Sequence, residues 1–267
     1  MILTMKSILL LAVGFTMLSP SITAQRPDSA QIAVRYKFSQ VRDTTNRDKP
    51  YTENMILLVG QRSCVYKTNE GPEQQRVSAN PDGTTRTDTR FLGTRVEYYQ
   101  FPNEKKMVRK DWIPMNAFII TDALPVIDWN ITSDTATFGG LHCQKATTHF
   151  KGRDYTAWFC SDLPLHIGPW KLNGLPGVIV EAYDGTNTVR FNFDGISKPA
   201  PTIILPPENG VKATDKEFSR FQEMAGKDPE AYSKLMAQYN GPSGPRIDMK
   251  PGSGPVTNNP IEIPEKR

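Results

Sequence analysis

Residues 143–160 read CQKATTHFKGRDYTAWFC, and this stretch decides the fold class. Two segments rich in β-branched and aromatic residues, 143–150 and 153–160, flank Lys151-Gly152. Glycine accepts the positive φ that a two-residue turn requires, and the flanking residue types favour extended strands. The stretch therefore predicts a β-hairpin.

The two cysteines lie at the ends of this hairpin. If Phe150 pairs with Arg153, Cys143 lies directly opposite Cys160 in a non-hydrogen-bonded pair, where Cα atoms approach to about 4.5 Å. That separation is close enough for a disulfide. In an oxidising compartment we expect this bridge, which leaves Cys64 as the odd cysteine, and two buried thiols are the alternative.

Outward from the hairpin, most of the chain has strand patterns. Ile32, Val34, Tyr36 and Phe38 recur at every second position, which is typical of a strand that is buried on one face. Residues 69–94 are polar and rich in turn signals, which predicts a long loop with at most one irregular strand. The other strand-length segments are 55–59, 96–101, 106–110, 126–132, 178–183 and 189–193.

These segments predict the domain organisation. Residues 25–205 are expected to form one mainly β domain, folded as a curved antiparallel sheet or an open barrel. Residues 206–240 are expected to form a helical extension. Residues 241–267 are rich in proline and glycine, which predicts a flexible tail that is disordered or extended.

Two short C-terminal helices follow from local signals. Thr214 and Glu217 have the spacing of a capping box, which predicts a helix over residues 215–225 that ends at the following glycine. Asp228-Pro229 resembles an N-cap followed by proline at the first helical position, and predicts a second helix over residues 229–239.

The N-terminus has the pattern of an export signal. Lys6 is the only charge in residues 1–24 and precedes an apolar run that ends in small residues, which predicts a signal peptide cleaved after Ala24. An apolar run of about 11 residues is too short to span a bilayer, so we expect no transmembrane span after cleavage. With 32 Lys and Arg against 28 Asp and Glu and no long charged block, a nucleic-acid partner is not expected.

A Gly/Pro-rich hexapeptide follows the hairpin: Gly174, Leu175, Pro176, Gly177, Val178 and Ile179. It resembles the hexapeptide of the GLPGLI family of exported Bacteroidota proteins, with valine in place of the second leucine. Upstream residues that share the resemblance include Trp129, Cys143, Phe150, Gly152, Trp158, Leu163-Pro164 and Gly168-Pro169. The resemblance implies an exported protein, in the periplasm or associated with the outer membrane, and no known activity.

Residues that carry chemistry are few. His142 and His149 lie seven positions apart on one predicted strand and so on opposite faces, which argues against a shared metal ion. Cys160, Asp162 and His166 are near one another in the sequence and could form a thiol site or a metal site. No metalloprotease, nucleophile-elbow, phosphate-loop or dinucleotide-binding motif is present, so neither a cofactor nor a catalytic residue is assigned.

The tryptophans are the remaining candidates for a binding site. Trp129, Trp158 and Trp170 could line a ligand groove on the open face of a curved sheet, or could simply be core residues. The leading hypothesis is a non-enzymatic protein of the cell envelope that binds a small apolar ligand or an envelope protein. The alternative is an exported thiol enzyme or a metal carrier, with its site near Cys160 and His166.

Overall fold

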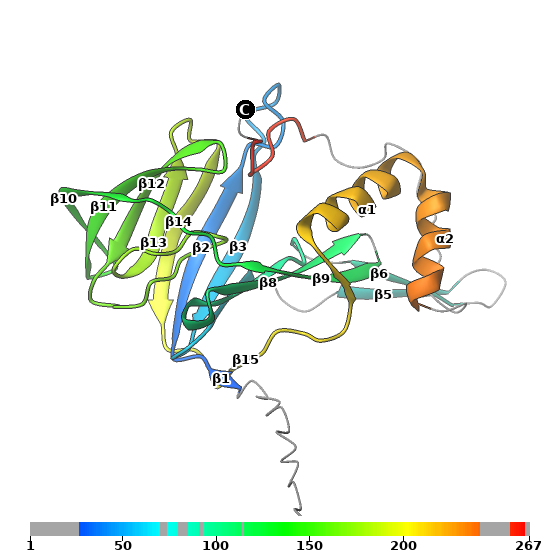
Figure 1. Cartoon of the computed structure of the whole chain (residues 1–267), viewed down its shortest axis with the longest axis horizontal. Coiled ribbons are helices and arrows are strands. Elements are labelled where there is room, and N and C mark those ends of the chain that lie inside the picture. Colours follow the sequence, from blue (N-terminus) through cyan, green and yellow to red (C-terminus); the bar gives the residue numbers. More distant parts are fainter. Residues whose placement is uncertain are drawn as a thin grey trace, which may run out of the picture.

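The structure, a computed structural model, describes residues 27–69, 74–79, 85–90, 93–113, 115–240 and 257–264. The fold is mainly β with two C-terminal helices, as predicted (Figure 1). The strands are β1 (Asp28–Ser29), β2 (Ile32–Gln40), β3 (Tyr51–Val59), β4 (Cys64–Thr68), β5 (Gln74–Ala79), β6 (Thr85–Arg90), β7 (Glu97–Phe101), β8 (Lys106–Ile113), β9 (Asn116–Ala123), β10 (Asn130–Phe138), β11 (Leu141–Phe150), β12 (Arg153–Cys160), β13 (Val178–Asp184), β14 (Val189–Ser197), β15 (Ile203–Ile204) and β16 (Val211–Ala213). The helices are α1 (Asp215–Lys227), α2 (Pro229–Asn240) and the short 3-10 helix η1 (Pro102–Glu104).

One twelve-stranded sheet organises the molecule. Its strand order is β10-β11-β12-β13-β14-β2-β3-β4-β7-β8-β9-β16, so the sheet ends at β10 and β16 and does not close into a barrel. Neighbouring strands are antiparallel except β16, which runs parallel to β9. In Figure 1 the strand direction turns from nearly vertical in β2 and β3 to nearly horizontal in β8 and β9. The sheet is therefore strongly twisted, as expected for a large antiparallel sheet.

The largest apolar cluster lies on one face of this sheet. The predicted alternation in β2 buries Tyr36 completely. The connection between β12 and β13 crosses this face and inserts Trp170, Leu172 and Leu175, each at most 2% exposed. The sheet and this connection together form the core that surrounds the candidate site.

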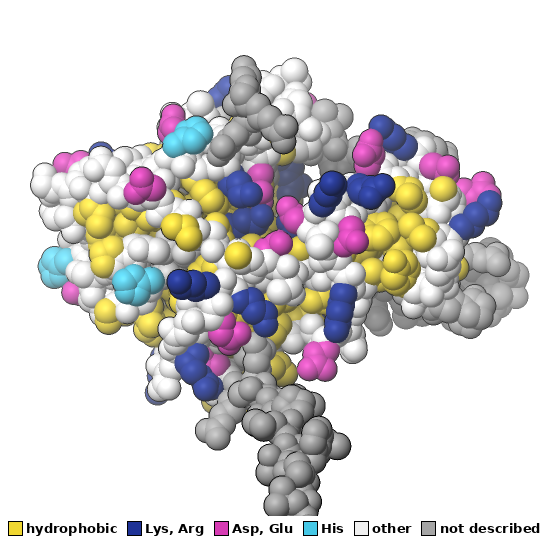
Figure 2. Space-filling view, viewed as in Figure 1, with side chains coloured by type: hydrophobic (Ala, Val, Ile, Leu, Met, Phe, Trp, Pro, Cys, Tyr) yellow, Lys and Arg dark blue, Asp and Glu magenta, His cyan; other side chains and the backbone are white. Residues whose placement is uncertain are grey.

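A second apolar cluster joins the sheet to the helices. Phe118 of β9 contacts the rings of Phe218 and Phe221 in α1. Figure 2 shows charged side chains between the apolar area beside the helices and the apolar area over β10–β14. Arg109 of β8, which is buried, pairs with Asp215 of α1 at 2.7 Å.

The two helices begin where the sequence predicts. The capping box is present, since Thr214 and Glu217 exchange hydrogen bonds, and Ala231 N donates to Asp228 Oδ1 at the start of α2. Gly226 does not end the first helix, which continues through Lys227. Among the described residues, no helix is long and apolar enough to cross a membrane.

Two strand predictions need correction. Residues 69–94 were expected to form a loop, but they contain the paired strands β5 and β6. β9, for which no strand was predicted, pairs along its length with β8. The sequence of β5 and β6 is mostly polar, so these strands lack the alternation of apolar residues on which the prediction depends.

Part of the tail that the sequence predicts to be disordered or extended is described in the structure. Residues 257–264 lie against the sheet, and Asn259 is 9% exposed. The predicted signal peptide, residues 1–24, and residues 241–256 of the predicted tail lie outside the described residues. We call residues 257–264 the C-terminal strap.

Candidate functional site

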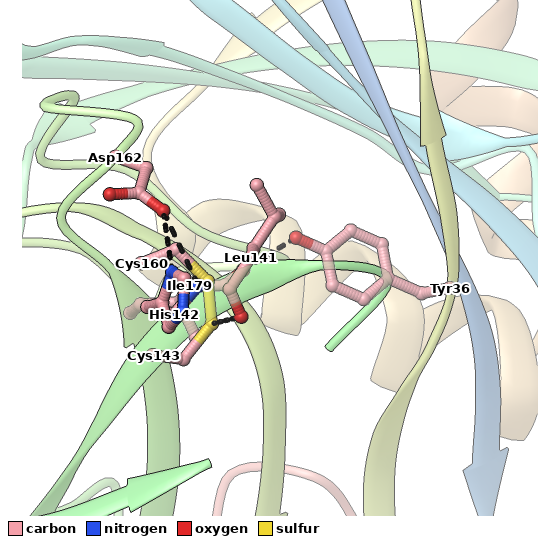
Figure 3. The surroundings of a disulfide bond; sticks show 7 residues. All are labelled: Tyr36, Leu141, His142, Cys143, Cys160, Asp162 and Ile179. Carbon is pink, nitrogen blue, oxygen red and sulfur yellow. Dashed lines mark hydrogen bonds and ion pairs between the residues drawn. A yellow bond between two sulfur atoms is a disulfide. The ribbon is translucent and has the colours of Figure 1, made fainter. Parts of the chain in front are cut away.

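The predicted hairpin forms with the predicted register and contains the disulfide. Phe150 pairs with Arg153, and Cys143 and Cys160 are bonded with a Cα–Cα distance of 4.2 Å. Both cysteines are buried (Figure 3). Cys64, the remaining cysteine, is buried and unpaired, and burial raises the pKa of its thiol to about 12. None of the three cysteines therefore offers a reactive thiolate.

The structure does not bring together the suggested thiol site. Cys160 is in the disulfide, and Asp162 lies beside His142, accepting a hydrogen bond from its backbone N–H at 3.3 Å (Figure 3). His166 is exposed, and its backbone carbonyl accepts a hydrogen bond from Gly174. In the described part of the chain, no group of three or more His, Cys, Asp or Glu side chains is placed to hold a metal ion.

The hexapeptide forms a buried corner at the start of β13. Leu175, Val178 and Ile179 are at most 1% exposed, and the Ile179 carbonyl accepts a hydrogen bond of 2.6 Å from the Tyr36 hydroxyl (Figure 3). A side chain at Gly177 would collide with the backbone carbonyl of Cys160. Close packing against β12 thus explains this glycine without a binding partner.

The three tryptophans occupy different places. Trp129 Nε1 donates to the Asn173 carbonyl at 2.8 Å, and Trp158 packs against the ring of Phe138. Trp170 is 2% exposed and lines a cavity on the face that carries the large core cluster. Of the three, only Trp170 is a lining residue of this cavity.

The cavity is mostly apolar and has a volume of about 140 Å³. Strands β2, β3, β4, β7 and β14 supply most of its wall. The apolar lining residues are Phe38, Met55, Tyr66, Val96, Tyr98, Trp170, Phe191 and Ile261, and the polar ones are Gln40, Arg42, Glu53 and Thr94. An apolar pocket with a few polar groups is the usual form of a small-molecule site.

The polar side chains of the cavity are nearly all paired. Glu53, 4% exposed, accepts hydrogen bonds from the Tyr51 hydroxyl at 2.5 Å and from Thr94 N at 2.8 Å. The Arg42 guanidinium lies 3.5 Å from the centre of the Tyr51 ring. Burial, and then the bond to Glu53, raise the pKa of Tyr51. These contacts leave Glu53 and Arg42 fixed beside the cavity.

Tyr66 is the exception. Its side chain lines the cavity and is buried, yet its hydroxyl has no hydrogen-bond partner among the described residues. Burial raises the pKa of Tyr66 well above its usual value, so the hydroxyl is neutral and can both donate and accept. An unpaired buried hydroxyl is destabilising by about 1–3 kcal/mol, so a ligand group that reached this hydroxyl would gain a hydrogen bond.

Trp170 adds backbone strain to the same wall. Its φ is +55°, a left-handed conformation that is unusual for a bulky residue. The indole is held against Phe191, whose ring is nearly parallel at a centroid distance of 6.4 Å, and against Tyr155. Strained residues that are fixed by their surroundings are concentrated at binding and catalytic sites.

Sequence reasoning missed the other lining residues. Phe38, Met55 and Phe191 lie in predicted strands, where their pattern indicated a buried face. Alternation of apolar residues identifies the face that is buried but not the place where side chains leave a space. The positive φ of Trp170 has no sequence signal either.

Comparisons with known proteins show similarity of fold alone. No family model matches the chain, and no curated protein matches it. Two solved structures of PNGF-II, in space groups P21 and C2, are similar with TM-scores of 0.50 and 0.51 and 11% sequence identity. The alignments cover 72% and 74% of this chain but 32% and 34% of PNGF-II, so the chain corresponds to about a third of that protein.

Proposed function

We propose that this chain is an exported, non-enzymatic binding protein of the cell envelope, located in the periplasm or at the outer membrane, and that its ligand is a small apolar molecule. The observation that carries the proposal is the apolar cavity, which five aromatic side chains line and which includes Tyr66 with its unpaired hydroxyl. Export and membership of the GLPGLI family rest on the N-terminal pattern and on the hexapeptide at residues 174–179.

The cavity suggests the chemical class of the ligand. Its volume of about 140 Å³ is close to that of apolar protein cavities that hold one benzene molecule, about 150 Å³. Five aromatic side chains line it, and Tyr66 offers one hydrogen bond. We therefore expect a group of the size of one ring that carries a single hydroxyl or carbonyl, and phenol and toluene are suitable probes with and without that group.

The test compares two tyrosine substitutions. Tyr66→Phe removes the unpaired hydroxyl of a residue that lines the cavity, and Tyr155→Phe removes a hydroxyl that is also buried and unpaired in the described structure but belongs to a residue outside the cavity lining. Because both changes remove an unsatisfied polar group, both variants should be at least as stable as the original protein.

The ligand response should separate the two variants. In NMR titrations of the purified protein, phenol is expected to bind more tightly than toluene and to shift signals of cavity residues. Tyr66→Phe should weaken phenol binding about tenfold, the effect of one lost hydrogen bond, and leave toluene binding unchanged. Tyr155→Phe should change neither. Absence of binding of both probes at millimolar concentration would contradict the proposal.

A further inference from the structure

The C-terminal strap is attached directly to the edge of the cavity. Asn258 N and Asn259 N donate to the Arg42 carbonyl at 3.0 and 3.1 Å, and Gln40 Nε2 donates to the Asn259 carbonyl at 2.9 Å. Gln40 and Arg42 are both lining residues of the cavity. In Figure 1 the strap is the red segment beside the upper ends of β2 and β3. The last described segment of the chain thus crosses the site that the first strands form.

One buried arginine holds the middle of the strap. Arg153 donates to Asn259 Oδ1 and to the Pro260 carbonyl, each at 2.6 Å, and to the Ile261 carbonyl at 3.1 Å. The same guanidinium pairs with Asp184 at 2.7 Å, and both side chains are at most 4% exposed. Burial alone would raise the pKa of Asp184, but its hydrogen bonds outweigh burial and lower it. The charged carboxylate fixes Arg153 in the orientation that receives the strap.

The strap also supplies part of the cavity wall. Ile261 is a lining residue and packs against the large core cluster. The next residue, Glu262, pairs with Lys171 at 2.5 Å and with Lys151 at 3.3 Å, and Ile263 N donates to the Lys151 carbonyl at 3.0 Å. Ile261 is therefore held over the cavity by polar contacts on both sides.

These contacts suit a segment that opens without unfolding the sheet. The strap is attached mainly by hydrogen bonds and ion pairs, and Ile261 is the strap residue that packs against the large apolar cluster. Segments with few buried apolar contacts open locally at lower free energy than core strands. We propose that the strap is a gate: its release admits the ligand, and its docking closes Ile261 over the bound ligand. This inference rests on the proposed function.

The test uses two adjacent asparagines. Asn259→Ala removes the side-chain bonds to Arg153 and to the Val41 carbonyl, which anchor the strap at the cavity. Asn258→Ala removes bonds to Thr44 N and Asp43, which are exposed and outside the cavity lining. NMR exchange spectroscopy with phenol should show entry and release at least tenfold faster in Asn259→Ala, from two lost hydrogen bonds, and within twofold of the original in Asn258→Ala.

Hydrogen exchange of the unsubstituted protein provides a second measurement. The amides of Asn258, Asn259 and Ile263 should exchange faster than those of β2 and β3, and saturating phenol should slow their exchange. If phenol binds but its exchange rate is the same in all three proteins, the gate is refuted and the binding function stands. If phenol binds to none of them, the binding function and the gate are both refuted.

Discussion

Loss of the ion pair between Arg153 and Asp184 should lower the free energy of unfolding of the protein. Replacing Arg153 by methionine leaves a buried carboxylate without its cation, a change that typically costs about 3–5 kcal/mol. Asp184 keeps hydrogen bonds from Thr188 N at 2.6 Å, Val189 N at 2.9 Å and the hydroxyls of Thr186 and Thr188. We therefore expect a loss of about 3 kcal/mol in the free energy of unfolding, at the lower end of that range.

Urea denaturation at pH 7 would measure this loss. The matched control is Arg190→Met, because Arg190 binds the side chains of Asn187 and Asn192 in a less buried setting, and its removal should cost less than about 1 kcal/mol. The double variant Arg153→Met/Asp184→Asn should lose less than the sum of the two single losses, since no uncompensated charge remains. A loss below about 1 kcal/mol for Arg153→Met, or strict additivity in the double variant, would refute this account of the pair.

The pH dependence gives an independent check of the same pair. The pKa of Asp184 is lowered in the folded protein, so its contribution to stability is present above the unfolded value of about 3.9 and is lost as the pH falls through the folded value. Without Arg153 the pKa of Asp184 in the folded protein rises, and the part of the stability that is lost in acid becomes smaller. The stability difference between the original protein and Arg153→Met should therefore decrease below about pH 4, and a difference that stays constant there would contradict the reasoning.

Three further predictions concern the cysteines and glycines. Cys143 and Cys160 should resist alkylation until reduction, and their joint replacement by alanine should cost about 3 kcal/mol in urea denaturation, from the loss of a loop closed over 17 positions. Alkylation of either residue in the native, unreduced protein would contradict the bridge. Cys64 should stay unreactive toward iodoacetamide in the native protein even after reduction, because it is buried with a pKa of about 12, and rapid labelling would show that it is accessible. Gly177→Ala should destabilise the protein by about 1–3 kcal/mol, because the added methyl group collides with the Cys160 carbonyl. Gly226→Ala in α1 should instead stabilise the protein by up to about 1 kcal/mol, because no atom outside the helix's own backbone lies within 4 Å of the added methyl group. Thermal melting that gave both changes the same sign would contradict this.

Local signals accounted for much of the fold. The turn at Lys151-Gly152 fixes the register of its hairpin, because each further pair is counted from the turn, and so the position of Cys143 opposite Cys160 followed from the sequence. The capping box at Thr214 and Glu217 likewise determined the start of α1, because its residues lie at a set spacing from the first helical residue. β5 and β6 have mostly polar sequences, and the pairing of strands that are distant in the sequence, such as β14 with β2, had no local signal.

The strap and the cavity depend on interactions that residue types do not reveal. Three of the groups that bind the strap to Arg153 and Gln40 are backbone carbonyls, and every residue has one. A proline-rich sequence therefore predicts disorder equally well whether or not the folded sheet offers hydrogen-bond donors to its carbonyls.

The donor is the more informative partner, because a buried arginine needs acceptors for a fork of five N–H groups. Arg153 directs two of its nitrogens to the strap and the third to Asp184 and Thr188. Without the strap, two of the three guanidinium nitrogens would lose these acceptors. The closed state is thus favoured by the sheet itself, and a ligand gate requires only that this preference be small enough to be reversed at intervals by thermal opening.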